Sequence, residues 1–176
     1  EGVTKQQFRE GIENGTVAEL LNKVPVEKGE CHFLPAGTPH AIGAGLLIAE
    51  IQTPSDTTYR VFDWNRTDSQ GNPRQLHIKQ AMESIHFDSS DIPAPESVGR
   101  LVDCDYFTVD KAHNTAGCEH LFEPGEPKTL VFIEGKAVFE PSDTEEEIKS
   151  GDCWLIPACY KGTLKLTEES EYLITK

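Results

Sequence analysis

The first half of the chain contains three side chains whose types could do chemistry: His40, Glu50 and Arg60. An imidazole can bind a metal ion through a ring nitrogen. A carboxylate can act as an acid or a base when burial raises its pKa, and a guanidinium can hold substrate oxygen atoms with paired donors. Structural roles are the alternative, with His40 a surface residue and Glu50 half of an ion pair in a buried strand. For Arg60 that alternative is a surface charge paired with Asp56 or Asp63.

His40 ends a motif with defined spacing. The segment "KGECHFLPAGTPH", residues 28–40, reads G-x5-P from Gly29 to Pro35 and P-x-G-x-x-H from Pro35 to His40. This spacing predicts a glycine that begins a strand, and then a tight turn shaped by Pro35 and Gly37. Such a turn would direct the imidazole into the interior of a barrel.

The chain repeats the scaffold of this motif near its C-terminus. The segment "SGDCWLIPACYKG", residues 150–162, keeps the glycine and the proline at the same spacing, as Gly151 and Pro157. At the end of the motif the copies differ, because Gly162 stands where the first copy has His40. The second copy is therefore expected to fold like the first but to lack the imidazole. The unit that contains it is expected to be structural and to bind no metal.

The residue pattern predicts a mainly β chain with a few helices. Residues 1–24 are expected to be helical, because they begin with a T-x-x-Q capping box. Residues 25–74 contain short apolar or alternating runs typical of strands, and residues 75–97 predict a helix followed by a linker. Residues 98–176 return to short strands, which indicates a sandwich or barrel. The expected strands of residues 25–74 are "ECHFLPA", "GLLIAEIQ" and "TTYRVFDW".

The composition of the chain limits the classes of molecule that it could bind. The chain has 176 residues, of which 37% are hydrophobic, so it can bury a core. Its 30 acidic and 16 basic residues give a net charge of −14, which argues against nucleic acid as a partner. No run approaches the roughly 18 apolar residues of a membrane span. The five cysteines form no CxxC pair, so reduced thiols and a cytoplasmic location are expected.

Two stretches resemble known families. The G-x5-P-x-G-x-x-H motif resembles the second conserved motif of the cupin superfamily. The following "HAIGAGLLIAEIQTPSDTTYRVFDWNR", residues 40–66, resembles the core signature of the short bacterial type I mannose-6-phosphate isomerases. The lead-in "GVTKQQFREGIENGTVAELLNKVPVEKGE" is also similar to that family. The resemblance implies cupin-type jelly rolls: the C-terminal part of a catalytic unit in residues 25–74, and a second, degenerate unit in residues 98–176.

The resemblance also implies roles for the three side chains. His40 matches the last zinc ligand of the family, Arg60 its active-site arginine, and Glu50 an acidic residue of the same pocket. The family's other zinc ligands have no counterpart here, because its pattern extends upstream of residue 1. The implied activity is zinc-dependent isomerisation of mannose 6-phosphate and fructose 6-phosphate, with one zinc ion in the complete protein. This chain alone is expected to be inactive.

Two alternatives remain open beside this activity. The chain could be a non-catalytic cupin module that binds a sugar or an effector, whereas an iron-dependent oxygenase is disfavoured by the "SDTTYR" block. An incomplete first barrel would also expose strand edges, through which the chain could associate with another copy. In the second unit, His113 and His120 flank Cys118, but their spacing fits no common zinc pattern and favours a loop.

Overall fold

The structure, a computed structural model, consists of two compact units. One contains residues Glu1–Lys28 and His32–Ala94, and the other contains Gly29–Cys31 and Pro95–Lys176. Within the described part of the chain, the helices are too short and too polar to cross a bilayer. The described residues are 2–64, 66–88, 93–140 and 146–176, so the predicted linker of residues 89–97 lies partly outside them.

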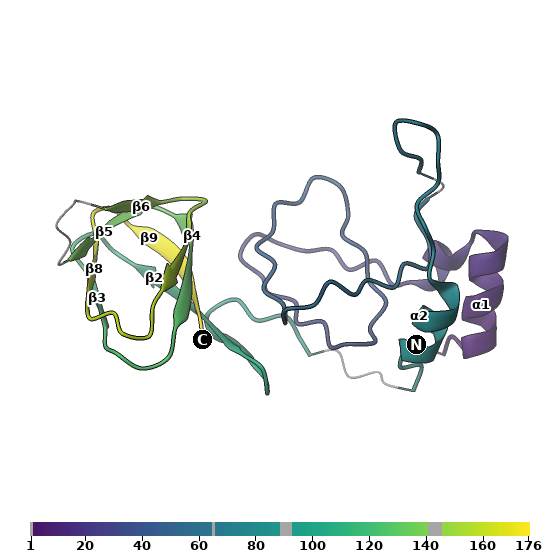
Figure 1. The fold of residues 1–176 in the computed structure, drawn as a ribbon, viewed down its shortest axis with the longest axis horizontal. Coiled ribbons are helices and arrows are strands. Elements are labelled where there is room, and N and C mark those ends of the chain that lie inside the picture. The colour runs from purple at the N-terminus through teal and green to yellow at the C-terminus, as the bar shows by residue number, and fades with distance from the viewer. Residues whose placement is uncertain (1, 65, 89–92, 141–145) are drawn as a thin grey trace. The chain divides into compact units, whose positions relative to one another are not determined.

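The first unit is built around two short helices, α1 (Lys5–Asn14) and α2 (Ile78–Ser84), which lie side by side (Figure 1). A 3-10 turn, η1 (Val17–Leu20), follows α1. The helices pack through a small apolar cluster because each presents one apolar face to the other. Its buried members are Phe8, Ile12, Val17 and Met82.

The start of α1 confirms the predicted capping box. The backbone N–H of Gln7 donates to the Thr4 hydroxyl at 3.2 Å, and the Thr4 N–H donates to the Gln7 side-chain oxygen at 2.8 Å. These reciprocal bonds satisfy two donors that a helix start would otherwise leave without partners. The helix ends at Gly15, which adopts a φ of +73°.

The strands predicted in residues 32–64 of the first unit are not formed among the described residues, so that prediction was wrong. A strand persists only where a neighbouring strand bonds to its backbone, and no such neighbour lies beside these runs in the described part of this unit. Apolar side chains of the middle run accordingly stay in solvent, with Leu47 101% exposed and Leu46 47% exposed. Val61 and Phe62 of the third run instead pack against the apolar cluster of the helices. These segments have the amino-acid composition of strands, but among the described residues no neighbouring strand pairs with them.

The second unit is a jelly roll of two antiparallel sheets (Figure 1). Five strands follow the order β1-β2-β9-β4-β7 in one sheet, and four follow the order β3-β8-β5-β6 in the other. This architecture confirms the predicted mainly β fold, with a jelly roll in the C-terminal part of the chain. The strands are β1 (Gly99–Asp103), β2 (Thr108–Asn114), β3 (Glu119–Phe122), β4 (Lys128–Glu134), β5 (Lys136–Glu140), β6 (Glu147–Lys149), β7 (Cys153–Ile156), β8 (Gly162–Leu166) and β9 (Ser170–Thr175).

Side chains from both sheets fill the interior of this jelly roll. Phe132 of β4 stacks on Tyr172 of β9 with ring centroids 5.3 Å apart, and both rings are almost fully buried. Phe139 of β5 stacks on Trp154 of β7 at 5.2 Å, which joins the two sheets. Such aromatic pairs dominate the apolar area that the fold removes from water.

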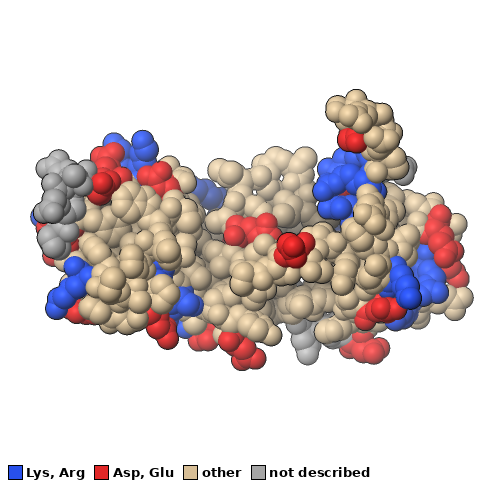
Figure 2. Space-filling view, in the orientation of Figure 1, with Lys and Arg blue, Asp and Glu red and all other residues tan. Residues whose placement is uncertain are grey.

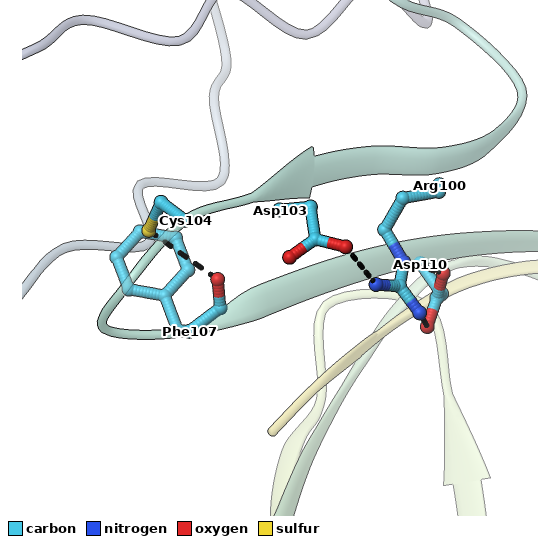
Figure 3. A network of polar contacts seen from close by, with 5 residues as sticks. All are labelled: Arg100, Asp103, Cys104, Phe107 and Asp110. Carbon is cyan, nitrogen blue, oxygen red and sulfur yellow. Dashed lines mark hydrogen bonds and ion pairs between the residues drawn. The ribbon is translucent and has the colours of Figure 1, made fainter.

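The hairpin of β1 and β2 is held on its outside by charged groups (Figure 3). The Arg100 guanidinium donates to the carboxylates of Asp110 and Asp103, and these contacts raise the pKa of Arg100. In the turn, the Cys104 thiol donates to the Phe107 carbonyl oxygen at 3.3 Å. Because the three charged side chains are largely exposed, their ion pairs add little to the free energy of unfolding.

The first residues of the motif belong to the second unit. Cys31 pairs with Glu96 through two backbone hydrogen bonds, of 2.7 and 3.1 Å. The Lys111 ammonium donates to the Gly29 carbonyl oxygen at 3.2 Å and lies 3.3 Å from the Glu171 carboxylate. These contacts fix the glycine end of the motif to the sheet that contains β2 and β9.

The two copies of the motif share one backbone turn. The Thr38 N–H donates to the Pro35 carbonyl oxygen at 3.1 Å, and the Tyr160 N–H donates to the Pro157 carbonyl oxygen at 2.9 Å. The glycines that begin the copies share a left-handed conformation, with φ of +95° in the first and +90° in the second. The repeat predicted from residue spacing is therefore present in the backbone.

The second copy has no room for a side chain where the first has His40. Gly162 is buried at the start of β8, and a Cβ atom there would lie 2.3 Å from the Tyr160 hydroxyl and 2.6 Å from the Glu140 carbonyl oxygen. The Tyr160 ring packs against Phe139 with centroids 5.9 Å apart, and burial raises the pKa of its hydroxyl. The aromatic core of the unit thus occupies the space that an imidazole would need.

We predict that Gly162→Ala lowers the free energy of unfolding by about 1–3 kcal/mol, because a backbone carbonyl and a packed ring must both move. Urea denaturation of the chain measures this change. Gly125→Ala is the matched control, since a Cβ atom there meets no atom within 4 Å. In the Tyr160→Phe background the cost of Gly162→Ala should shrink, because the hydroxyl is gone. Equal stability of the Gly162→Ala and Gly125→Ala proteins would contradict this account.

Candidate active-site residues

The turn that precedes His40 is tied to the end of α2. Gly37 adopts a φ of +84°, the conformation that a type II turn needs at its third position. Its carbonyl oxygen accepts a hydrogen bond from the His86 N–H at 3.2 Å. A Cβ atom on Gly37 would lie 2.7 Å from the Ser84 carbonyl oxygen, so only glycine fits this contact. The motif glycine is thus required by both conformation and packing.

His40 is exposed, and residues 32–64 form no strand among the described residues, so the predicted placement of its imidazole inside a barrel was wrong. One of its ring nitrogens already has a partner. Its Nδ1 lies 2.9 Å from the Thr38 carbonyl oxygen. Since a carbonyl only accepts, this contact requires the proton on Nδ1 and leaves the lone pair on Nε2. Metal-binding histidines commonly use such a bond to fix the ring and its tautomer. This bond therefore restrains the His40 ring and leaves Nε2 to accept another partner.

Arg60 is held by its backbone. Its N–H donates to His77 Nδ1 at 3.3 Å, and its carbonyl oxygen accepts from the His77 N–H at 2.7 Å. Among the described residues, no ion pair joins its guanidinium to a carboxylate. Asp63, one partner considered for it, pairs instead with Arg66 at 2.5 Å and lies 3.9 Å from Arg74. The Arg60 guanidinium is thus not neutralised by the partners that the sequence offered.

Glu50 is exposed and lies outside any strand. The alternative of an ion pair in a buried strand is therefore wrong for this residue. No hydrogen bond or ion pair of the described residues connects His40, Glu50 and Arg60 to one another. The structure ties the His40 turn and the Arg60 backbone to opposite ends of α2, whereas it gives Glu50 no such attachment.

The chemistry of these side chains does not fit a complete zinc site. Zinc is held by three or four protein ligands, even where a catalytic position stays open. In the ranges that the structure describes, no three His, Cys, Asp or Glu residues lie close enough together to hold a metal ion. Among the described residues, His40 therefore does not have two further potential ligands clustered around it.

The histidines of the second unit have structural partners. His113 of β2 lies 2.9 Å from the Glu169 carboxylate, and His120 of β3 packs on Phe122 with ring centroids 4.7 Å apart. Burial lowers the pKa of His120, with a smaller contribution from Lys128. Both residues lie on strands, so the predicted loop was wrong. The described residues place neither in a metal-binding group.

Sequence reasoning missed His77, which contacts Arg60 more closely than any residue considered beforehand. The sequence gives little indication of this contact. His77 follows the polar stretch of residues 65–75, and its spacing from Arg60 matches neither a helix nor a strand pair. The pairing joins residues 17 positions apart, and neither composition nor spacing reveals it.

No family model matches the chain. The mannose-6-phosphate isomerase ManA of Bacillus subtilis is 35% identical over 98% of this chain and 56% of its own length. A mannose-6-phosphate isomerase of Streptococcus mutans is 47% identical over 48% of this chain and 27% of its own length.

The fold gives the same result. The crystal structure of a mannose 6-phosphate isomerase from Bacillus subtilis matches with a TM-score of 0.85 and 28% identity. The match covers 98% of this chain and 57% of that structure, so the chain spans a little over half the length of these relatives. In sequence and in fold, the chain is similar to mannose-6-phosphate isomerases over 98% of its own length.

Proposed function

We propose that the protein carrying this chain isomerises mannose 6-phosphate and fructose 6-phosphate. The observation that carries the proposal is the match in fold along 98% of the chain, at a TM-score of 0.85, to a mannose 6-phosphate isomerase. The reaction converts an aldose into a ketose phosphate by moving a proton between adjacent carbon atoms through an enediol. It therefore needs a group that transfers the proton and groups that stabilise the developing negative charge.

Arg60 is the proposed charge-stabilising group of this chain. A guanidinium presents two parallel donors, which suit an enediolate or the oxygen atoms of a phosphate. The described structure supports this role, because no carboxylate competes for the Arg60 charge. Glu50 is proposed as an acid or base of the same pocket. Since Glu50 is exposed in this chain, the role requires that other parts of the complete protein cover it.

His40 is proposed as one ligand of a single zinc ion in the complete protein. The bond from its Nδ1 to the Thr38 carbonyl oxygen supports binding through Nε2. Because the described residues lack three clustered ligands, the remaining ligands would come from outside the described part of the chain. The 176-residue chain alone would then be inactive. A bound zinc ion supplies Lewis-acid polarisation of substrate oxygen atoms.

A small phosphosugar is the proposed partner, and because the chain has a net charge of −14, its phosphate would need a local cation such as Arg60. The net charge of −14 disfavours nucleic acid, and acidic and basic side chains are interspersed on the face drawn in Figure 2. A cytoplasmic location remains the proposal drawn from reduced cysteines. Self-association through exposed strand edges stays a prediction, although the first unit forms no strands among its described residues.

A non-catalytic module that binds a sugar or an effector is the second candidate. The exposure of His40 and Glu50, without a contact between them, favours it for the chain as it stands. Both candidates would bind a phosphosugar, so turnover of the sugar is the property that distinguishes them.

The complete gene product, purified and supplied with zinc, should convert mannose 6-phosphate into fructose 6-phosphate. Chelation should abolish the activity, and zinc should restore it. The 176-residue chain with zinc should show no turnover in the same coupled assay. Turnover by that chain would mean that its own residues complete the site. A zinc-loaded gene product that binds the sugar without converting it would favour the binding module.

Arg60→Lys in the complete gene product should lower kcat/KM by about 10-fold to 100-fold, because lysine cannot reproduce the paired donors. Arg66→Lys is the matched control, since it keeps a cation beside Asp63 and is expected to leave kcat/KM nearly unchanged. Zinc content and the midpoint of unfolding are measured for both variants. Unchanged kinetics in Arg60→Lys would assign Arg60 to a structural role.

A further inference from the structure

We propose that His77 is a positioning residue that sets the place of Arg60, an inference that rests on the proposed function of Arg60. Both polar groups of the Arg60 backbone bond to this one residue. The Arg60 N–H donates to His77 Nδ1 at 3.3 Å, and the His77 N–H donates to the Arg60 carbonyl oxygen at 2.7 Å. One of these two bonds uses the imidazole, so the side chain of His77 is part of the clamp.

The clamp matters because Arg60 has no strand to support it. In a sheet, both backbone groups of such a residue would bond to one neighbouring strand, which further bonds of the ladder hold in place. The described residues around Arg60 form no strand, so its position depends on a few individual bonds. A guanidinium that binds a substrate must stay within a fraction of an ångström of its productive position. Its backbone therefore has to be fixed by the contacts to His77.

His77 is itself well anchored. It is the residue directly before α2, and the Ala81 N–H donates to its carbonyl oxygen at 2.9 Å. Met82, one turn into α2, is 2% exposed in the apolar cluster shared with α1. The Tyr59 ring lies beside the imidazole at a tilt of 52°, with ring centroids 6.3 Å apart. The packed helices thus provide a rigid base from which His77 can hold Arg60.

The bond also fixes the tautomer of His77. Since the Arg60 N–H donates to Nδ1, this nitrogen carries the lone pair, and the proton of the neutral ring resides on Nε2. Asparagine places its side-chain oxygen on the same carbon that holds Nδ1 in histidine, so it can accept the same bond. Leucine fills a comparable volume but cannot accept. These two substitutions separate the hydrogen bond from packing.

The test uses His77→Leu and His77→Asn in the complete gene product. His77→Leu should lower kcat/KM about 10-fold or more, whereas His77→Asn should stay within about threefold of the parent. Zinc content and the midpoint of unfolding, measured alongside, identify any loss due to misfolding. In the Arg60→Lys background, His77→Leu should cost little more, because the two residues act as one unit. A full additional loss in that background would overturn the proposal, as would parental activity in His77→Leu.

Amide hydrogen exchange provides a readout besides activity. The Arg60 amide should exchange faster in His77→Leu than in the parent, and His77→Asn should restore its protection. Unchanged exchange in His77→Leu would overturn the clamp even if activity fell. A parent protein without isomerase activity would refute the proposed function instead, and the exchange of the Arg60 amide would then decide the role of His77.

Discussion

The requirement that every strand has a neighbour governs this structure. In the second unit the requirement is met: β9 bonds to β2 on one side and to β4 on the other, and the aromatic core forms between the two sheets. In the first unit, runs with equally suitable composition find no neighbour among the described residues, and they remain turns and extended segments. His40, Glu50 and Arg60 lie among these unpaired segments of the first unit. Their geometry therefore depends on single hydrogen bonds rather than on a sheet.

α2 takes over part of the role that a sheet would have. At its beginning, His77 holds the backbone of Arg60, and just beyond its end, His86 holds the turn that leads to His40. Because α2 is seated in the apolar cluster with α1, these two attachments share one rigid base. Glu50 has no comparable attachment, and it is the candidate whose proposed role requires the most additional structure.

Local chemistry was predictable from the sequence, and non-local contacts were not. The capping box at Thr4 and the turn at Pro35 depend on neighbouring residues, so their patterns were sufficient. The runs of residues 32–64 have the composition of strands, but composition cannot reveal whether a partner strand exists. The contact between His77 and Arg60 belongs to the same class, since only the folded unit brings these residues together. The expectation of zinc ligands outside this chain came from the family resemblance rather than from periodicity, and it stays a prediction.

The two copies of the motif show how one scaffold can serve opposite purposes. Both use a left-handed glycine and a proline turn with the same backbone hydrogen bond, so the scaffold does not depend on the residue that follows. In the second copy, Tyr160 and the aromatic rings around it occupy the space beside Gly162, which adds buried apolar area and excludes a ligand. In the first copy, Gly37 packs on α2 and His40 remains free to bind through Nε2. The space that Tyr160 occupies beside Gly162 is not available to an imidazole at that position. Separating the two tasks between copies therefore lets one unit contribute stability while the other keeps a position for chemistry.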